Sequence, residues 1–175
     1  MKFKVGSKVF YPSHGAGFIK REKEIEFNGE KKKYFEFELV TNPLSISTPV
    51  DNVENLGIRD IMPIEKIKSS IKVLKKTPAV NPKVKDFNTM LNMFKDLDES
   101  SDIEASIQII QYCNFVKKQR EKEGRLIPIS IEKQLEGAIR NIVGELAVST
   151  GVTLKTASKN FTKIRRTACC LLFSK

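Results

Sequence analysis

The amino-acid sequence predicts an α+β protein, in which a small β-barrel or sheet is followed by an all-α helical bundle. Up to about residue 60, short runs of alternating apolar and polar residues are separated by turn residues. After Pro63, apolar residues recur every three or four positions in segments that begin with capping residues. Nearly all of the excess positive charge falls in this second part, which indicates that the two parts have different roles.

The composition is that of a globular cytoplasmic protein. Of the 175 residues, 40% are hydrophobic and 30% are charged. No apolar run approaches the roughly 20 residues of a membrane helix, and the N-terminus lacks the apolar core of a signal peptide. The three cysteines, two of them adjacent at Cys169 and Cys170, suit neither a disulfide framework nor a zinc site. We therefore expect buried free thiols and no membrane segment.

The β unit is organised around the stretch VGSKVFYPSHGAG, from Val5 to Gly17. A short strand ends in a turn at Pro12, and glycines at 15 and 17 permit positive φ and close backbone approach where the next strand begins. The turn contains the only histidine of the chain, His14. Because no cysteine or aspartate lies near it in sequence, we expect His14 to be a hydrogen-bonding strut and not a catalytic base.

A hairpin follows this corner. The strand that begins at Gly17 runs to Phe27, and the pair Asn28-Gly29 indicates a tight turn into a strand from Lys33 to Val40. Within that second strand, alternation predicts that one set of residues faces the core and the other faces solvent. The inward set is Phe35, Phe37 and Leu39, and the outward set is Glu36 and Glu38.

The segment from Leu44 to Pro49 is predicted to be a strand at or near an edge of the sheet. Pro49 has no backbone N–H and cannot donate to a hydrogen-bond ladder, which confines it to an edge. With this segment, about five short strands precede Asp60, and this number is typical of a small twisted sheet or barrel.

Five helices are expected after Pro63. In chain order, their predicted start signals are Pro63, the pair Asn81-Pro82, the capping box of Ser101 with Glu104, then Ser130, and finally Thr153. Gly151 is predicted to end the fourth helix. The apolar residues at helical spacing should form one core. They are Ile64, Ile67, Ile71 and Leu74; Phe87, Met90, Leu91, Phe94 and Leu97; Ile103, Ile107 and Ile110; Ile131, Leu135, Ala138, Ile142 and Leu146; and Leu154, Ala157, Phe161, Ile164, Ala168 and Leu171.

The net charge of +10 is unevenly distributed. Residues 1–62 hold 10 Lys and Arg against 9 Asp and Glu, whereas residues 63–175 hold 21 against 12. No acidic residue follows Glu145, and the last helix carries a stripe of Lys155, Lys159, Lys163 and Arg166. This distribution argues for a polyanionic partner, most often nucleic acid, and the alternative is a solvated helix face.

The sequence contains no pattern that supports catalysis. Paired carboxylates, a metal-ligand cluster and a phosphate-binding GxxxxGK[ST] loop are all lacking. We therefore expect a protein that is not an enzyme and has no cofactor.

Several motifs resemble the CarD family of bacterial transcription regulators. They occur in the family's order and with its spacing, as FKVGSKVFYPSHGAG at Phe3–Gly17, NGEKKKYFEFELV at Asn28–Val40, Pro49, GIRD at Gly57–Asp60 and IVGELA at Ile142–Ala147. The N-terminal motif also resembles the polymerase-binding part of transcription-repair coupling factors, but this chain is too short to hold their ATPase domains.

The resemblance implies a Tudor-like domain over residues 1–60 that docks on the β subunit of bacterial RNA polymerase through a sheet edge. It also implies a basic helical domain over residues 63–175 that contacts double-stranded promoter DNA. The whole would be a monomeric, nucleoid-associated regulator that stabilises the open promoter complex. The alternative is a general DNA-binding protein without polymerase docking, followed by a Tudor-like module that binds RNA or ribosomes.

The implied polymerase contacts lie on two strands. Family members often carry arginines at the positions of Ile25 and Ser47, so docking here would depend more on backbone pairing and apolar contact. The full expected set is Ile25, Phe27, Ser45, Ile46, Ser47, Thr48 and Pro49.

The implied DNA contacts include an aromatic wedge. Family members place a tryptophan near the start of the second helix, where it enters the minor groove beside the melted bubble. This chain has no tryptophan, and Phe87 is the aromatic residue nearest to that position. Phe87 could either insert into the groove or pack in the core, and both roles stay open. The other expected DNA contacts are Lys83, Lys85, Lys133, Arg140, Lys155 and Lys159.

Overall fold

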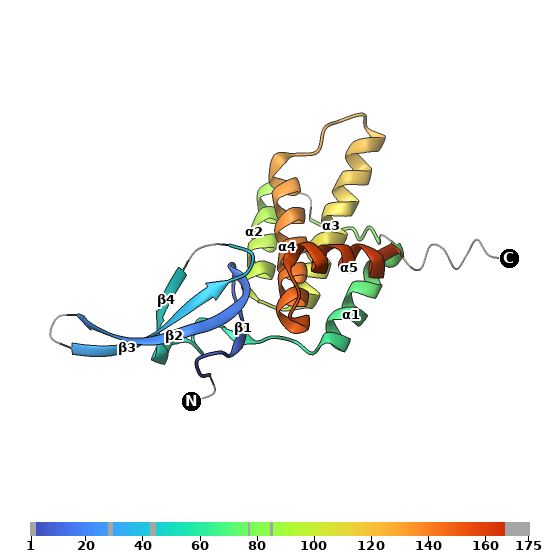
Figure 1. The fold of residues 1–175 in the computed structure, drawn as a ribbon. Coiled ribbons are helices and arrows are strands. Elements are labelled where there is room, and N and C mark those ends of the chain that lie inside the picture. Colours follow the sequence, from blue (N-terminus) through green and yellow to red (C-terminus); the bar gives the residue numbers. More distant parts are fainter. Residues whose placement is uncertain (1–2, 28–29, 43–44, 77, 85, 167–175) are drawn as a thin grey trace.

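The computed structural model describes residues 3–27, 30–42, 45–76, 78–84 and 86–166. It confirms the predicted α+β architecture, because an antiparallel sheet lies at one end of the molecule and the helices lie at the other (Figure 1). The strands occur in the order β4-β3-β2-β1-β5 across the sheet. They are β1 (Lys8–Tyr11), β2 (Gly15–Phe27), β3 (Glu30–Leu39), β4 (Ser45–Pro49) and β5 (Arg59–Asp60).

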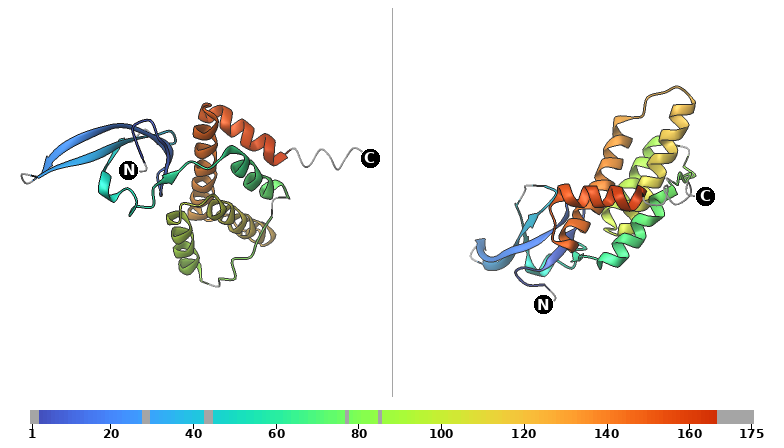
Figure 2. Two further views of the ribbon diagram at one scale, coloured as in Figure 1. Left: turned by 90° about the horizontal axis from the view of Figure 1, so that it is seen from below. Right: turned by 45° about the vertical axis from the view of Figure 1, so that its right-hand side comes forward.

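The helical part packs around a long antiparallel pair, α3 (Ile103–Lys122) and α4 (Ile129–Thr150) (Figure 2). The other helices are α1 (Ile64–Val73), α2 (Phe87–Glu99) and α5 (Leu154–Arg166), and short 3₁₀ turns are formed by η1 (Val50–Asn52) and η2 (Leu74–Lys76). The hairpin of β2 and β3 extends away from the helices, so its far end reaches into solvent (Figure 1).

The corner between β1 and β2 has the geometry that its glycines predict. Gly15 has a φ of +93°, in the region that favours glycine, and a Cβ on Gly17 would lie 2.3 Å from the backbone oxygen of Glu38. Nδ1 of His14 lies 2.9 Å from the carbonyl oxygen of Pro12 and donates to it. His14 is therefore a local strut, as expected, and Gly17 permits close approach of β2 and β3.

We expect Gly17→Ala to lower the free energy of unfolding by about 1–3 kcal/mol, because the added methyl group overpacks against backbone that cannot rotate away. Gly137→Ala is the matched control, since a Cβ at Gly137 meets nothing within 4 Å. That change should leave stability equal or raise it by up to about 1 kcal/mol. Urea denaturation compares the two variants, and equal midpoints would contradict the prediction.

The core of the sheet is formed by its aromatic residues, as the alternation predicted. Phe35, Phe37 and Leu39 are buried, and the rings of Phe35 and Phe37 meet edge to face with centroids 6.5 Å apart. Glu38 is exposed, as expected.

The prediction that Glu36 faces solvent was wrong, because this residue is only 6% exposed. Its side chain does lie on the outer face of β3, but neighbouring side chains cover the carboxylate. Nε of Arg21 donates to Oε2 at 2.9 Å, Nζ of Lys23 forms an ion pair with the same oxygen, and Oγ of Ser45 donates to Oε1 at 3.2 Å. Strand pairing thus brought together charges that are far apart in sequence.

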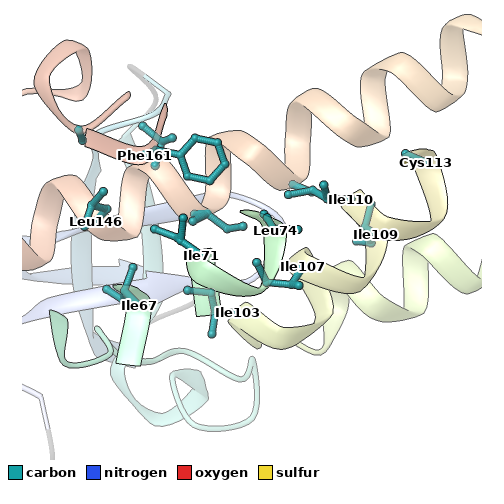
Figure 3. Close-up of a cluster of buried hydrophobic side chains, with 14 of the residues drawn as sticks. Ile67, Ile71, Leu74, Ile103, Ile107, Ile109, Ile110, Cys113, Leu146 and Phe161 are labelled. Carbon is teal, nitrogen blue, oxygen red and sulfur yellow. The ribbon is translucent and has the colours of Figure 1, made fainter. Parts of the chain in front are cut away.

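One continuous hydrophobic cluster forms the centre of the helical bundle (Figure 3). The predicted helical faces supply most of it, including Ile67, Ile71, Ile103, Leu146 and Phe161. Ala168 and Leu171, which were also predicted to belong to the core, lie outside the described residues. The three- and four-residue spacing therefore identified the buried face of each helix in the described part.

The start of α2 differs from its prediction. Asn81 and Pro82 do not begin a helix, because Oδ1 of Asn81 instead accepts from the backbone N–H of Lys83 at 2.8 Å. The helix begins later, where Oδ2 of Asp86 accepts from the N–H of Thr89 at 2.9 Å. An Asn side chain that accepts from the backbone N–H two residues later forms a turn. The sequence pattern alone could not distinguish this turn from a helix cap.

Two other caps were also misplaced. Ser101 has a φ of +60° and its hydroxyl donates to the carbonyl of Glu99, so α3 starts after Asp102 instead. The fourth helix starts at Ile129, directly after Pro128, and not after Ser130. The cap at α5 was predicted correctly, because Oγ1 of Thr153 accepts from the N–H of Thr156 at 3.3 Å.

Of the three cysteines, Cys113 lies in the described part of the chain and is buried in the helical core. Burial raises the pKa of its thiol to about 12, and Sγ lies 3.7 Å from the carbonyl oxygen of Ile131. It is thus a protonated packing residue, as predicted. Cys169 and Cys170 lie outside the described residues.

Candidate polymerase and DNA surfaces

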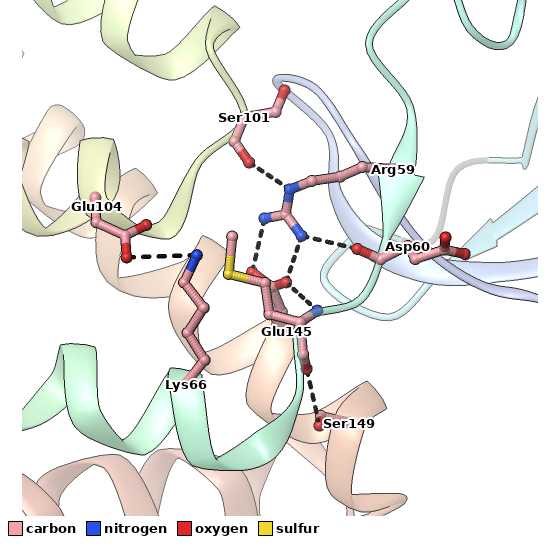
Figure 4. A network of polar contacts seen from close by, with 8 residues as sticks. Arg59, Asp60, Lys66, Ser101, Glu104, Glu145 and Ser149 are labelled. Carbon is pink, nitrogen blue, oxygen red and sulfur yellow. Dashed lines mark hydrogen bonds and ion pairs between the residues drawn. The ribbon is translucent and has the colours of Figure 1, made fainter.

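A buried ion pair joins the sheet to the helices (Figure 4). Nη1 of Arg59 in β5 lies 2.6 Å from Oε1 of Glu145 in α4, and Nη2 lies 3.0 Å from Oε2. Glu145 is only 1% exposed, and its Oε1 also accepts from the backbone N–H of Met62 at 2.9 Å. Nε of Arg59 donates to the carbonyl of Ser101 at 2.7 Å, and its guanidinium lies 4.5 Å from the ring centroid of Phe10.

This contact connects the two distant motifs GIRD and IVGELA, which contain Arg59 and Glu145 respectively. Both motifs are evident in the sequence, but their contact was not predicted. An isolated glutamate in an otherwise apolar helical stretch was the available signal, because a buried carboxylate requires a partner.

Close packing reinforces the same junction. A Cβ on Gly144 would lie 2.6 Å from Cγ2 of Thr41, so α4 approaches the end of β3 as closely as a glycine allows. Beside it, Phe10, Ala16 and Val148 form a small buried cluster with members from both the sheet and α4. The sheet and the bundle therefore form one continuous body.

The candidate polymerase surface is the edge strand β4, which among the described strands pairs with β3 alone. Because Pro49 has no N–H, its pair with Tyr34 cannot be a hydrogen-bonded pair of the antiparallel ladder. Backbone groups alternate along a strand, so the N–H groups of Ser45 and Ser47 point to the free edge. The structure thus places unpaired donors where the resemblance implies docking.

The side chains of this edge fall on two faces. Ser45 and Ser47 are exposed, whereas Ile46 is half-buried and Thr48 is buried, with its Oγ1 3.3 Å from the hydroxyl of Tyr11. Thr48 and Ile46 therefore face the sheet core. Beyond the edge strand, Ile25 is exposed on the projecting hairpin, and the side chain of Phe27 lies outside the described part.

The outer face beside this edge carries the ion-pair cluster around Glu36. The Lys23 and Arg21 side chains that bond the carboxylate hold the pKa of Glu36 down at about 2. At neutral pH this glutamate is therefore ionised, and it compensates the positive charge of its two neighbours.

The candidate DNA surface begins at the first residue of α2. Phe87 is 38% exposed and does not belong to the buried core, which contains Met90 and Phe94 of the same helix. Of the two roles left open for Phe87, packing in the buried core is therefore contradicted, because the helix starts at this residue and its ring lines a surface groove. Lys83 is exposed nearby, and Lys85 lies outside the described residues.

A groove of about 500 Å³ separates the start of α2 from the end of α3. Phe87 lines it on one side, and Arg120 and Arg125 line it on the other. Neither arginine was among the predicted DNA contacts, because both lie in a run of mixed charge, KKQREKEGR from Lys117 to Arg125.

The other predicted DNA residues fall on two separate faces. Lys133 and Arg140 are exposed on α4, seven residues apart and thus on one side of the helix. Lys155 and Lys159 are exposed on α5, which follows the opposite end of α4. At 1.5 Å per residue, about 15 Å of helix separates Arg140 from the end of α4 at Thr150, and about 26 Å separates Lys133 from it.

The described residues contain no group of three or more His, Cys, Asp or Glu side chains that could hold a metal ion. Within the same part of the chain, no helix is both long enough and apolar enough to cross a membrane.

Comparison with known proteins relates the chain to a family model and to a curated relative. Residues 3–62 match a family model described as the CarD-like/TRCF RID domain. A curated relative from Bacillus subtilis (strain 168), named "Putative transcription factor YdeB", is 22% identical over 153 residues. That alignment covers 87% of this chain and 95% of the relative, so it includes the helical part as well as the sheet.

Proposed function

Residues 3–62 are a CarD-like domain with a Tudor-like fold, and from this premise we propose that the chain is a transcription regulator that bridges RNA polymerase and promoter DNA. In this proposal, the sheet docks on the polymerase β subunit and the helices contact double-stranded DNA. The contact stabilises the open promoter complex without any catalytic step, in the cytoplasm and at the nucleoid. The division of labour follows residues 1–60 and 63–175.

The free edge of β4 carries the polymerase half of the proposal. An exposed strand edge can accept a strand of the partner, and main-chain hydrogen bonds then supply affinity. The outward N–H groups of Ser45 and Ser47 are the donors that such a strand would use, and Ile25 adds an exposed apolar contact. Alternative docking by ion pairs is disfavoured, because the nearby cations Arg21 and Lys23 are already bonded to Glu36.

Charge and the position of Phe87 support the DNA half. The net excess of positive charge lies in the helical part, where it would contact phosphates with little sequence preference. Phe87 stands at a helix start with Lys83 close by in sequence, and an apolar side chain in that setting can insert between base steps.

The docking surface is tested by Ser47→Pro in the full chain, with polymerase pull-down and affinity measurement. Proline removes the outward donor without removing a bond to β3, so binding should weaken by about 1–3 kcal/mol. Ser47→Ala is the matched control and should bind normally. If Ser47→Pro retains full affinity while circular dichroism shows an intact fold, the interface lies elsewhere. If the unmodified chain captures no polymerase, the docking half of the proposal is wrong, and duplex binding alone would then indicate a general DNA-binding protein.

The DNA face is tested by the salt dependence of duplex binding. Removing Lys133 and Arg140 together should flatten the slope of log K against log salt by roughly one to two units, because each phosphate contact contributes about 0.9. Replacing Lys155 and Lys159 together removes the same charge from α5. If replacing Lys155 and Lys159 also flattens the slope, the DNA face extends to α5. If replacing Lys133 and Arg140 leaves the slope unaltered, α4 does not contact DNA.

A further inference from the structure

The two most exposed large hydrophobic residues of the described chain lie together at the tip of the α3–α4 hairpin. Leu126 is 91% exposed and Ile129 is 70% exposed. The segment that carries them is packed against the protein, because its residues Ile127 and Ile131 contact the helical core. The chain thus turns one set of apolar side chains inward and presents the other set to solvent.

The tip is held in place by backbone hydrogen bonds. At the end of α3, Gly124 has a φ of +64° and the N–H of Arg125 donates to the carbonyl of Arg120 at 2.9 Å. At the start of α4, the N–H of Ile131 donates to the carbonyl of Pro128 at 2.9 Å. A partner that binds this tip therefore does not have to order a flexible loop first.

Positive charge flanks the two apolar side chains. Lys133 follows Ile129 by four residues and lies on the same face of α4, and Lys122 is on the last turn of α3. Both lysines are exposed, and neither forms an ion pair with another described residue. Of the nearby glutamates, Glu121 pairs with Lys117 and Glu123 pairs with Arg125, whereas Glu132 is exposed beside Lys133 in the first turn of α4.

The tip also adjoins the surface assigned to DNA. The groove beside Phe87 is lined by Arg120 and Arg125, and Arg125 directly precedes Leu126. The upper end of the bundle in Figure 1, where α3 ends and α4 begins, is the end away from the junction with the sheet. The groove therefore places Phe87 beside the end of α3 that leads into the tip.

We propose that Leu126 and Ile129 form a second apolar wedge, which enters the minor groove of the promoter duplex beside the contact of Phe87. Lys122 and Lys133 would bind the flanking phosphates. Aliphatic side chains that insert at a base step unstack it partly and widen the groove, and the flanking cations hold the duplex against them. The inference rests on the proposed function. Phe87 presents less apolar surface than a tryptophan would, and the side chains of Leu126 and Ile129 would add apolar surface to the contact.

The full-length double variant Leu126→Ser/Ile129→Ser tests this proposal on a promoter complex formed with RNA polymerase. Val73→Ser is the matched control, because Val73 is 55% exposed on α1. We expect the double variant to shorten the open-complex lifetime about tenfold in a competitor-challenge assay. It should also abolish the fluorescence increase of 2-aminopurine placed at the upstream fork. Val73→Ser should match the unmodified protein in both assays, and both variants should retain its melting temperature.

Unchanged lifetime and fluorescence in the double variant would overturn the wedge. If the double variant instead alters only the mass measured by light scattering, the tip binds a second copy of the chain and the proposal is also wrong. Failure of the proposed function is a different result, in which the unmodified protein fails to bind polymerase or to prolong the open complex. The salt slope should stay unaltered in the double variant, because no charge is removed.

Discussion

Replacing Glu145 by alanine should lower the free energy of unfolding by about 3–5 kcal/mol, which is the usual loss when one partner of a buried ion pair is removed. The change leaves the guanidinium of Arg59 without its carboxylate and the N–H of Met62 without its acceptor. Equilibrium denaturation in urea measures the effect, and the sheet and the helices should then unfold in separate transitions.

The matched control is Glu65→Ala, which removes the exposed partner of Lys68 within α1. Exposed pairs of this kind contribute about 0.5 kcal/mol or less. Glu145→Gln should fall between the two variants, since its amide oxygen can still accept from Met62. Equal losses for Glu65→Ala and Glu145→Ala would mean that the junction is not held by this ion pair.

Phe87→Ala should shorten the lifetime of the open promoter complex about tenfold while leaving polymerase docking intact. An aromatic contact with an unstacked base contributes about 1–3 kcal/mol, and each 1.4 kcal/mol corresponds to a factor of ten. Because the side chain is 38% exposed and outside the core, thermal stability should fall by less than about 1 kcal/mol.

Phe94→Ala provides the contrast on the same helix, seven residues further on. Phe94 is fully buried, so its removal should cost about 3–5 kcal/mol of stability. A large loss of melting temperature in Phe87→Ala, comparable to that of Phe94→Ala, would assign Phe87 to packing. Stable Phe87→Ala with an unaltered open-complex lifetime would remove it from the DNA contact.

The parts of this fold that repeat along the chain could be predicted from sequence. Alternation in YFEFELV identified the buried faces of Phe35 and Phe37, and three- and four-residue spacing identified Ile71 and Leu146 in the helical core. Both patterns depend only on the local geometry of a strand or a helix. For the same reason, the edge position of β4 could be inferred from Pro49 alone.

The features that depend on distant contacts could not be predicted. The carboxylate of Glu36 is covered by Arg21 and Lys23 because a bulge and the register of β2 and β3 bring them together. The pairing of Arg59 with Glu145 spans 86 residues, and neither residue type indicates its partner. Phe87 was ambiguous because it continues the apolar face of its helix and is also the aromatic residue nearest the expected wedge position, and its exposure depended on where α2 starts.

The junction around Arg59 has a consequence for which promoters such a bridge can serve. A flexible linker would let the helices search for DNA at many distances, but here the separation between the β4 edge and Phe87 is a fixed length of the folded chain. B-form DNA turns by about 34° for each base pair. A docked protein would thus reach DNA at one fixed distance from the polymerase. One base pair inserted between the polymerase footprint and the melted region would rotate the minor groove away from the side chains of the helical part.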